Sequence, residues 1–239
     1  MKLQPRKSRL NKVITFHVIS AVPESLASYI DASIIGRARK QKLIAVKPVS
    51  LRDYVPGGKS GYRAIDDSPY GGGPGMVLKV EPIYKAVTPL QKKPKTRTIL
   101  FSTRGKQFTE TDARRLAKYQ NIILICGRYE GVDERVAEHL ADEEISFGDF
   151  VLSGGEIPAL AVIDAVSRKI PGVLGKYESL EEVKGSYPVY TKPEVFKPRG
   201  AKRAWKVPAV LLSGDHKKIE SWRRGLQNPK DSDILSEHS

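Results

Sequence analysis

The chain has 239 residues, of which 40% are hydrophobic, enough for a packed core, and this excludes a wholly disordered protein. Lys and Arg number 41 against 27 Asp and Glu, so the formal net charge is +14, which favours a polyanionic partner such as nucleic acid or an anionic membrane surface. The single cysteine, Cys126, excludes an internal disulfide framework and a zinc site built on paired cysteines, and is typical of a reducing, cytoplasmic location. No apolar run approaches the roughly 20 residues that cross a bilayer, so we expect a protein outside the membrane.

The basic residues lie mainly near the two ends of the chain. Residues 1–12 carry five basic groups and no acid, and residues 184–230 carry twelve basic groups against three acids, whereas 13–183 is nearly neutral. Residues 1–12 have no apolar stretch and are not a secretory signal; a shortened transit peptide is an alternative to a basic extension. We therefore expect a globular body with basic segments that hold a phosphate backbone, the alternative being solvated lysine-rich surface.

Strand-like and helix-like segments alternate along the body, which predicts an α/β fold with a mainly parallel sheet. Short apolar segments bounded by polar residues or glycine predict strands at 13–20, 98–102, 122–127 and 207–213. Thr109 and Asp112 have the spacing of a capping box, which predicts a helix from there to Tyr119. An almost continuously apolar segment predicts a buried helix at 157–168, and a last helix is expected at 215–225. The Pro-, Lys- and Arg-rich stretch 188–208 is predicted to be a linker or mobile loop.

Three glycine-rich segments are candidate ligand-binding loops. Residues 70–76, Tyr-Gly-Gly-Gly-Pro-Gly-Met, match neither a Walker loop nor the dinucleotide fingerprint, which disfavours P-loop NTPases and Rossmann dehydrogenases. Residues 126–135 and 146–156 follow predicted strands, where ligands bind in open α/β sheets, and Phe147, Phe150 and Leu152 can supply apolar walls. For each segment the alternative is a tight turn without ligand contact.

Taken in order, these segments resemble a known family. The segments DDSPYGGGPGM, LICGRYEGVDERV, SFGDFVLSGGEIPA, IDAVSRKIPGVLG, YTKPEV and PAVLLSGDHKKIESWR resemble, from about residue 14 to residue 224, the TrmD family of bacterial tRNA (guanine-N1-)-methyltransferases, of the SPOUT class. The resemblance implies a SPOUT-type α/β fold with a C-terminal trefoil knot and a small C-terminal helical region. It also implies a homodimer with its active sites at the subunit interface. The implied reaction is methyl transfer from S-adenosylmethionine to N1 of the guanine immediately 3′ of the anticodon, position 37 of tRNA, with magnesium as a possible further cofactor.

The same resemblance assigns site residues and a domain plan. It implies that the cofactor is bound by Phe101, Ser102, Thr103, Gly127, Phe147, Gly148, Asp149, Phe150, Val151, Leu152, Gly154 and Gly155, where Thr103 replaces the family's usual proline. The residues implied near the target base are Gly73, Gly75, Tyr129 and Glu130. We expect a basic extension at 1–12, the knotted domain at 13–177, a linker at 178–190 and a basic tRNA-binding region at 191–239.

The catalytic residues are matched unequally. Methylation of guanine N1 requires a general base, because the neutral N1 has no free lone pair in the ring plane, and a positive charge near O6 stabilises the resulting anion. Arg168 matches the family's active-site arginine; otherwise it is a surface residue that ends a helix. The family's aspartate is missing, and direct counting places Val183 there, so Glu182 is the expected base after a one-residue shift, ahead of Glu181. The alternative is a solvated acidic patch without a catalytic role.

Two further departures bear on RNA binding. The basic stretch 197–206 is longer than its family counterpart, and its Trp205 among cations suits stacking on an exposed base, unless the ring packs down. The chain also ends soon after Arg224 and lacks much of the family's last helical region. The first expectation is an active methyltransferase. The alternatives are a catalytically impaired, knotted RNA-binding protein and a methyltransferase for another RNA.

Overall fold

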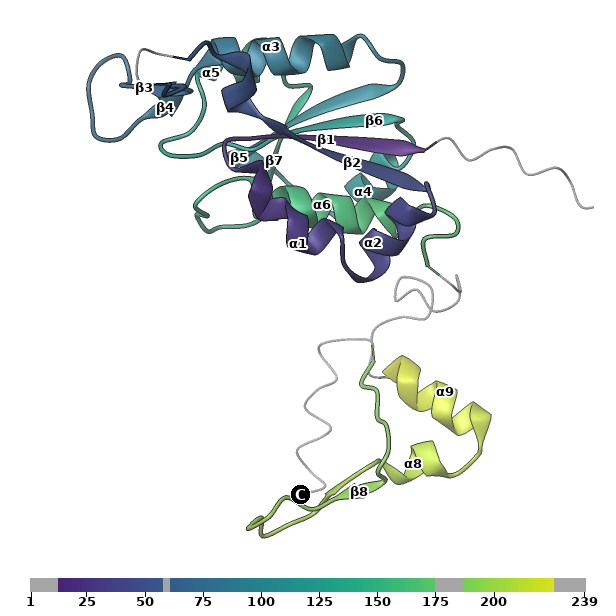
Figure 1. The fold of residues 1–239 in the computed structure, drawn as a ribbon. Helices are drawn as coiled ribbons and strands as arrows, with labels where there is room; N and C mark the ends of the chain where they lie inside the picture. Colours follow the sequence, from purple (N-terminus) through teal and green to yellow (C-terminus); the bar gives the residue numbers. More distant parts are fainter. Residues whose placement is uncertain (1–12, 58–60, 175–186, 226–239) are drawn as a thin grey trace, which may run out of the picture. The chain divides into compact units, whose positions relative to one another are not determined.

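A computed structural model describes residues 13–57, 61–174 and 187–225, in two compact units, Met1–Gly175 and Lys176–Ser239 (Figure 1). The predicted extension at 1–12 and residues 178–186 of the predicted linker lie outside the described residues. The expected domain boundaries therefore stay predictions.

The first unit is built on a five-stranded parallel sheet, as the sequence predicted. Its strands lie in the order β2 (Ile44–Ser50), β1 (Ile14–Ser20), β6 (Asn121–Ile125), β5 (Thr96–Gln107) and β7 (Glu143–Ser146). Each neighbouring pair is parallel. Parallel strands are covered on both faces, which explains why β6 is apolar from Ile122 to Ile125 and why β1 is mainly apolar. Their carboxyl ends meet at one edge of the sheet, where ligands bind in such folds.

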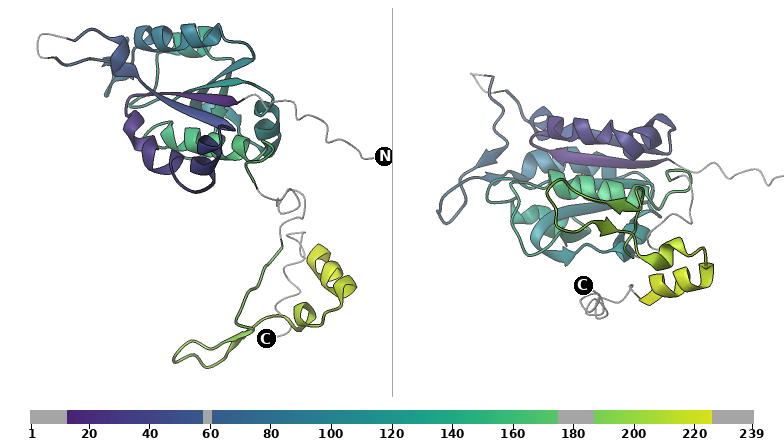
Figure 2. Two further views of the ribbon diagram at one scale, coloured as in Figure 1. Left: turned by 45° about the vertical axis from the view of Figure 1, so that its right-hand side comes forward. Right: turned by 90° about the horizontal axis from the view of Figure 1, so that it is seen from below.

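Helices cover both faces of the sheet (Figures 1 and 2). On one face lie α1 (Ala27–Ile30), α2 (Ser33–Lys40), α4 (Glu110–Leu116) and α6 (Glu156–Ser167); on the other lie α3 (Val80–Gln91) and α5 (Glu134–His139). Successive strand residues alternate between two cores, so that Leu124 packs in the first core and Ile123 and Ile125 in the second. The 3₁₀ helices η1 (Pro23–Leu26) and η2 (Leu51–Tyr54) and the short pair β3 (Asp66–Asp67) and β4 (Val77–Leu78) complete this unit.

Strand β5 has an unusual relation to β7. Both Phe101 and Lys106 pair with Ile145, and the register shifts between them. Gly105 lies in the intervening segment, and a Cβ there would come within 2.6 Å of the Ile145 backbone nitrogen. The segment between Phe101 and Lys106 therefore passes tightly against β7.

Two predicted helices of the first unit are confirmed. Thr109 and Asp112 form the predicted capping box: the Thr109 side chain accepts from the Asp112 backbone N–H, and the Asp112 side chain accepts from the Thr109 backbone N–H. Helix α6 is buried on most of its circumference, as its apolar sequence predicted.

The second unit corrects one predicted strand. It contains β8 (Val195–Phe196), β9 (Trp205–Lys206), α8 (Ala209–Leu212) and α9 (His216–Gly225). The prediction of a strand at 207–213 is wrong, because Pro208 is the N-cap of α8 and a short apolar run does not by itself distinguish a strand from a helix. The stretch 188–208, predicted to be a linker or loop, includes an antiparallel hairpin of β8 and β9. The predicted last helix is confirmed as α9.

Candidate active site

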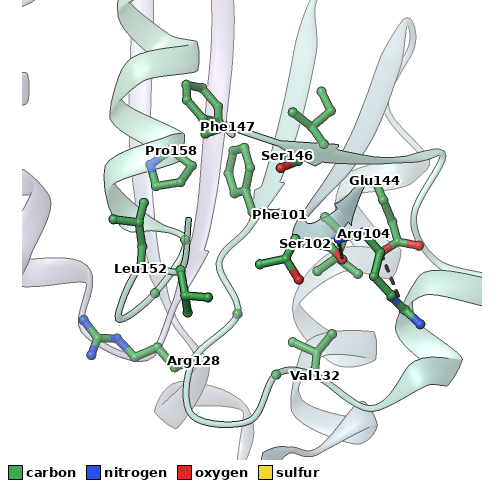
Figure 3. Close-up of a pocket in the computed structure, with 18 of the residues that line it drawn as sticks. Phe101, Ser102, Arg104, Arg128, Val132, Glu144, Ser146, Phe147, Leu152 and Pro158 are labelled. Atoms are coloured by element: carbon green, nitrogen blue, oxygen red, sulfur yellow. Dashed lines mark hydrogen bonds and ion pairs between the residues drawn. The ribbon is translucent and has the colours of Figure 1, made fainter. Parts of the chain in front are cut away.

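A pocket of about 560 Å³ lies beside residues 100–104 of β5 and at the carboxyl ends of β6 and β7 (Figure 3). Its lining includes this segment of β5, the loop 127–132, and residues 146, 147 and 150–155 of a second loop. The sequence predicted ligand loops after the second and third of these strands. The volume falls within the range of about 300–1,000 Å³ that is typical of small-molecule sites.

Two of the loops are held together through their backbones. The Gly155 N–H donates to the Gly127 carbonyl at 3.0 Å, and Arg128 and Gly154 form an isolated β-bridge. A Cβ on Gly155 would come within 2.7 Å of the Cys126 Cα, so only glycine permits this approach. The two loops therefore form one wall of the pocket.

Aromatic rings form another part of the pocket. Phe147 lies edge-on to Phe101, with ring centroids 6.2 Å apart (Figure 3). It also stacks on Phe108, with ring centroids 5.3 Å apart. Phe150 and Val151 also line the pocket but are largely exposed. The pocket thus combines a packed aromatic side with an exposed apolar margin, an arrangement suited to a flat ring.

Three charged side chains that line the same pocket were not predicted as site residues from the sequence: Arg104, Glu134 and Glu144. Arg104 donates from Nη2 to both carboxylate oxygens of Glu134, at 2.7 and 2.9 Å, and the same atom lies 3.6 Å from Glu144 Oε2. That Glu144 oxygen is buried and makes no hydrogen bond to any described residue. Strand alternation was the available signal, because Glu143 and Glu144 must point to opposite faces of β7.

A buried polar network supports the glycine wall. Ser20 Oγ donates to Glu156 Oε1 at 2.6 Å, and Arg128 Nε lies 3.4 Å from the same oxygen. Burial, and secondly the charge of Glu156, raise the pKa of the Cys126 thiol well above its usual value. The thiol is therefore neutral at physiological pH and serves as a small apolar core side chain.

The four residues expected near the target base are placed differently from one another. Tyr129 and Glu130 line the pocket, and Tyr129 has a left-handed φ of 61°. Gly75 contacts Glu130, because a Cβ there would lie 2.4 Å from Glu130 Oε1, and the Glu130 N–H donates to the Met76 carbonyl. Gly73 is exposed and does not line the pocket. The Gly-rich loop thus reaches the site through its last glycine.

One expected catalytic residue, Arg168, does not line this pocket. Arg168 is the C-cap of α6, whereas the pocket contacts the beginning of that helix. Pro158 is the residue of α6 that lines the pocket, and at 1.5 Å per residue Arg168 lies about 15 Å further along the helix. Glu182 and Glu181 lie outside the described residues. Of the expected cofactor residues, Gly148 and Asp149 do not line the pocket.

Two global features concern membranes and metals. Within residues 13–57, 61–174 and 187–225, no helix combines the length and apolarity needed to span a bilayer. The same residues contain no cluster of three or more His, Cys, Asp or Glu side chains placed to hold a metal ion.

Comparisons with known proteins relate this arrangement to one family. The family model described as tRNA (Guanine-1)-methyltransferase TrmD matches residues 14–233. The tRNA (guanine-N(1)-)-methyltransferase of Dehalococcoides mccartyi is 47% identical over 214 residues, covering 87% of this chain and 83% of the relative. That of Myxococcus xanthus is 46% identical with the same coverage. The crystal structure of tRNA (m1G37) methyltransferase from Aquifex aeolicus matches with a TM-score of 0.73 and 42% identity, covering 94% of this chain and 99% of that one. The chain therefore belongs to the TrmD family of tRNA (guanine-1)-methyltransferases.

Proposed function

We propose that this chain transfers the methyl group of S-adenosylmethionine to N1 of guanine 37 of tRNA, the nucleotide immediately 3′ of the anticodon. The observation that carries the proposal is the pocket beside β5 and at the carboxyl ends of β6 and β7, because ten of the twelve expected cofactor residues line it. The relatives' names supply the reaction, and the net charge of +14 suits a tRNA substrate. We place this activity in the cytoplasm.

The pocket's donor set fits S-adenosylmethionine. Phe101 and Phe147 offer apolar surface to an adenine ring. Glu130, Glu134 and Glu144 outnumber Arg104 and Arg128 in the lining, and this excess of negative charge suits a sulfonium or ammonium group. The buried Glu144 oxygen, which lacks a hydrogen bond within the described part of the chain, is available to a ligand donor. When bound, the cofactor supplies an electrophilic methyl group on sulfur.

The chain's own residues must then handle the N1 proton. We assign the proton to the Glu182 carboxylate, with Glu181 as its alternative, because a glutamate performs the chemistry of an aspartate with one more methylene of reach. The Arg168 guanidinium stabilises negative charge that develops at O6. Tyr129 and Glu130, which line the pocket, orient the base.

The position of Arg168 makes a homodimer part of the proposal. The length of α6 separates Arg168 from the pocket of its own chain, so we infer that each pocket receives this arginine from a second copy. A trefoil knot is likewise proposed. The pairing of both Phe101 and Lys106 with Ile145 supports it, because the chain between them passes tightly against β7.

Methyl transfer from labelled cofactor to a tRNA transcript tests the proposal. Wild type is expected to methylate a transcript with guanine 37 and not one with adenine there. Glu182→Gln and Arg168→Ala are expected to lose at least 100-fold in rate while still binding cofactor. Lys118→Ala removes an exposed cation outside the pocket and serves as the control. Binding of cofactor and tRNA without transfer would instead indicate the impaired RNA-binding protein, and methylation of other RNA only would identify another substrate.

Complementation tests the shared site. Arg168→Ala and Gly155→Val are each expected to be inactive, the second because its side chain has no room beside Cys126. A mixed dimer has one site with an intact pocket and an intact arginine, so activity is expected to return on mixing. Failure to recover would place both groups in the same chain's site. Assays with EDTA and with added Mg²⁺ test whether magnesium is required.

A further inference from the structure

The hairpin of β8 and β9 exposes two aromatic rings on one face. Phe196 pairs directly with Trp205, and the ladder continues with a bond from the Val207 N–H to the Glu194 carbonyl at 2.9 Å. Directly opposed residues of an antiparallel pair point to the same face, so the two rings are neighbours, with centroids 5.7 Å apart and planes tilted by 55°. Phe196 is 50% exposed and Trp205 65% exposed. The alternative that Trp205 packs down is therefore wrong.

The loop between the two strands has a defined turn. The Ala201 N–H donates to the Pro198 carbonyl at 3.1 Å, and Gly200 has a φ of 81°. A positive φ at the third residue of a four-residue turn is characteristic of type II, which is why glycine stands there. This turn defines the backbone conformation at the tip of the basic loop. It leaves the two rings uncovered by apolar residues of the loop.

The surroundings of the rings are strongly basic. Residues 191–207 contain one acid, Glu194, and six cations: Lys192, Lys197, Arg199, Lys202, Arg203 and Lys206. Across the parts of the chain that the structure describes, none of these six forms an ion pair with a carboxylate. Uncompensated positive charge beside exposed aromatic faces is the combination that binds single-stranded nucleic acid, where cations neutralise phosphates and rings stack on bases.

We propose that this hairpin is a second RNA-binding element, in which the Phe196–Trp205 pair stacks on an unpaired nucleotide of the tRNA while the basic loop contacts its phosphates. The inference rests on the proposed function only in naming tRNA as the RNA. The hairpin lies within the second unit and shares no residue with the cofactor pocket. It therefore contributes affinity for RNA and takes no part in the chemical step.

Binding of a tRNA transcript in the presence of S-adenosylhomocysteine, without turnover, measures this contribution. Trp205→Ala is expected to weaken binding roughly 5-fold to 150-fold, the range for loss of one stacked base, and Trp205→Phe to restore most of it. Tyr84→Ala removes a comparably exposed ring from α3 and is expected to leave affinity unchanged. Lys202→Ala combined with Arg203→Ala is expected to reduce the salt dependence, the slope of log K against log salt, by roughly 1.4 to 1.8.

A second readout keeps the proposal testable if a variant disturbs the hairpin. Trp222→Phe leaves Trp205 as the single tryptophan, and tRNA is expected to quench its fluorescence. Unchanged affinity of Trp205→Ala together with unquenched Trp205 would overturn the proposal. So would binding of the hairpin to anionic phospholipid vesicles in place of RNA. Methyl transfer is measured separately. If the protein transfers methyl groups but the hairpin variants and Trp205 fluorescence show no RNA contact, this inference alone is refuted. If tRNA quenches Trp205 but no methyl group is transferred, the proposed reaction alone is refuted.

Discussion

Ser20, the last residue of β1, donates a 2.6 Å hydrogen bond from Oγ to Oε1 of Glu156, the first residue of α6. Both side chains are buried, and 136 positions separate them in the sequence. Glu156 directly follows the glycines of the pocket wall, so this bond fixes the start of α6 against the sheet. A carboxylate at this place also interacts favourably with the N-terminal end of the helix dipole.

Ser20→Ala is expected to lower the free energy of unfolding by about 1–3 kcal/mol, because it removes a partner from a buried carboxylate. It is also expected to weaken cofactor binding, because the start of α6 loses a contact. Ser25→Ala removes an exposed hydroxyl that bonds to the Val22 carbonyl and should cost about 0.5 kcal/mol or less. Urea unfolding checks both variants, and equal losses would contradict the role given to Ser20.

Gly155→Ala is expected to weaken cofactor binding at least tenfold. The added Cβ would approach the Cys126 Cα to 2.7 Å, so the backbone that joins the two pocket loops must move. Gly57→Ala is the control, since its Cβ would meet no atom of the described residues closer than 3.9 Å and its φ is not positive. Calorimetric titration with S-adenosylhomocysteine measures both. Wild-type affinity in Gly155→Ala would show that the close approach is dispensable.

Tyr129→Gly is expected to impair tRNA methylation without loss of stability. Tyr129 has a φ of 61°, a conformation that costs a bulky residue about 1–2 kcal/mol and glycine little, which offsets the greater chain entropy of glycine. Tyr84→Gly removes a similarly exposed tyrosine from the interior of α3 and should lower stability by about 1 kcal/mol. Urea unfolding measures the effect of each substitution on stability, and the KM for tRNA measures its effect on substrate binding. A loss of stability in Tyr129→Gly as large as in Tyr84→Gly would refute the strain argument.

Stability is expected to fall in mild acid because of His17. Burial, and secondly the charge of Lys93, lower the pKa of His17 to about 4 from the usual 6.5. Above pH 6.5 the ring is neutral in both folded and unfolded chains, so its contribution is complete. Below pH 6.5 the unfolded chain binds a proton that the folded chain rejects until about pH 4. The expected loss between pH 7.5 and pH 5 is about 2 kcal/mol.

Urea unfolding of wild type and His17→Gln across this pH interval isolates the histidine. The glutamine variant keeps a polar side chain near Lys93 and does not titrate, so its stability should change less with pH. Parallel pH dependences for the two proteins would show that other groups are responsible.

Much of the fold was predictable because local signals are strong in this chain. The apolar runs of β1 and β6, the capping box at Thr109 and the apolar length of α6 each specify an element without reference to the rest. The strand expected at 207–213 failed for the opposite reason. A four-residue helix leaves too short a pattern to show its period, and its context decided its form.

The functional site, like the fold, was partly predictable from the sequence and partly decided by the tertiary structure. The sequence alone determined the three glycine-rich segments, the places of two of them, 126–135 and 146–156, after strands, and the family to which their order belongs. Only the tertiary structure decided that Arg104 joins Glu134 and Glu144 in the pocket and that Ser20 supports Glu156. Chain order fixes which strand precedes each loop, whereas contacts between residues distant in sequence depend on the register of the sheet and the packing of the helices on it.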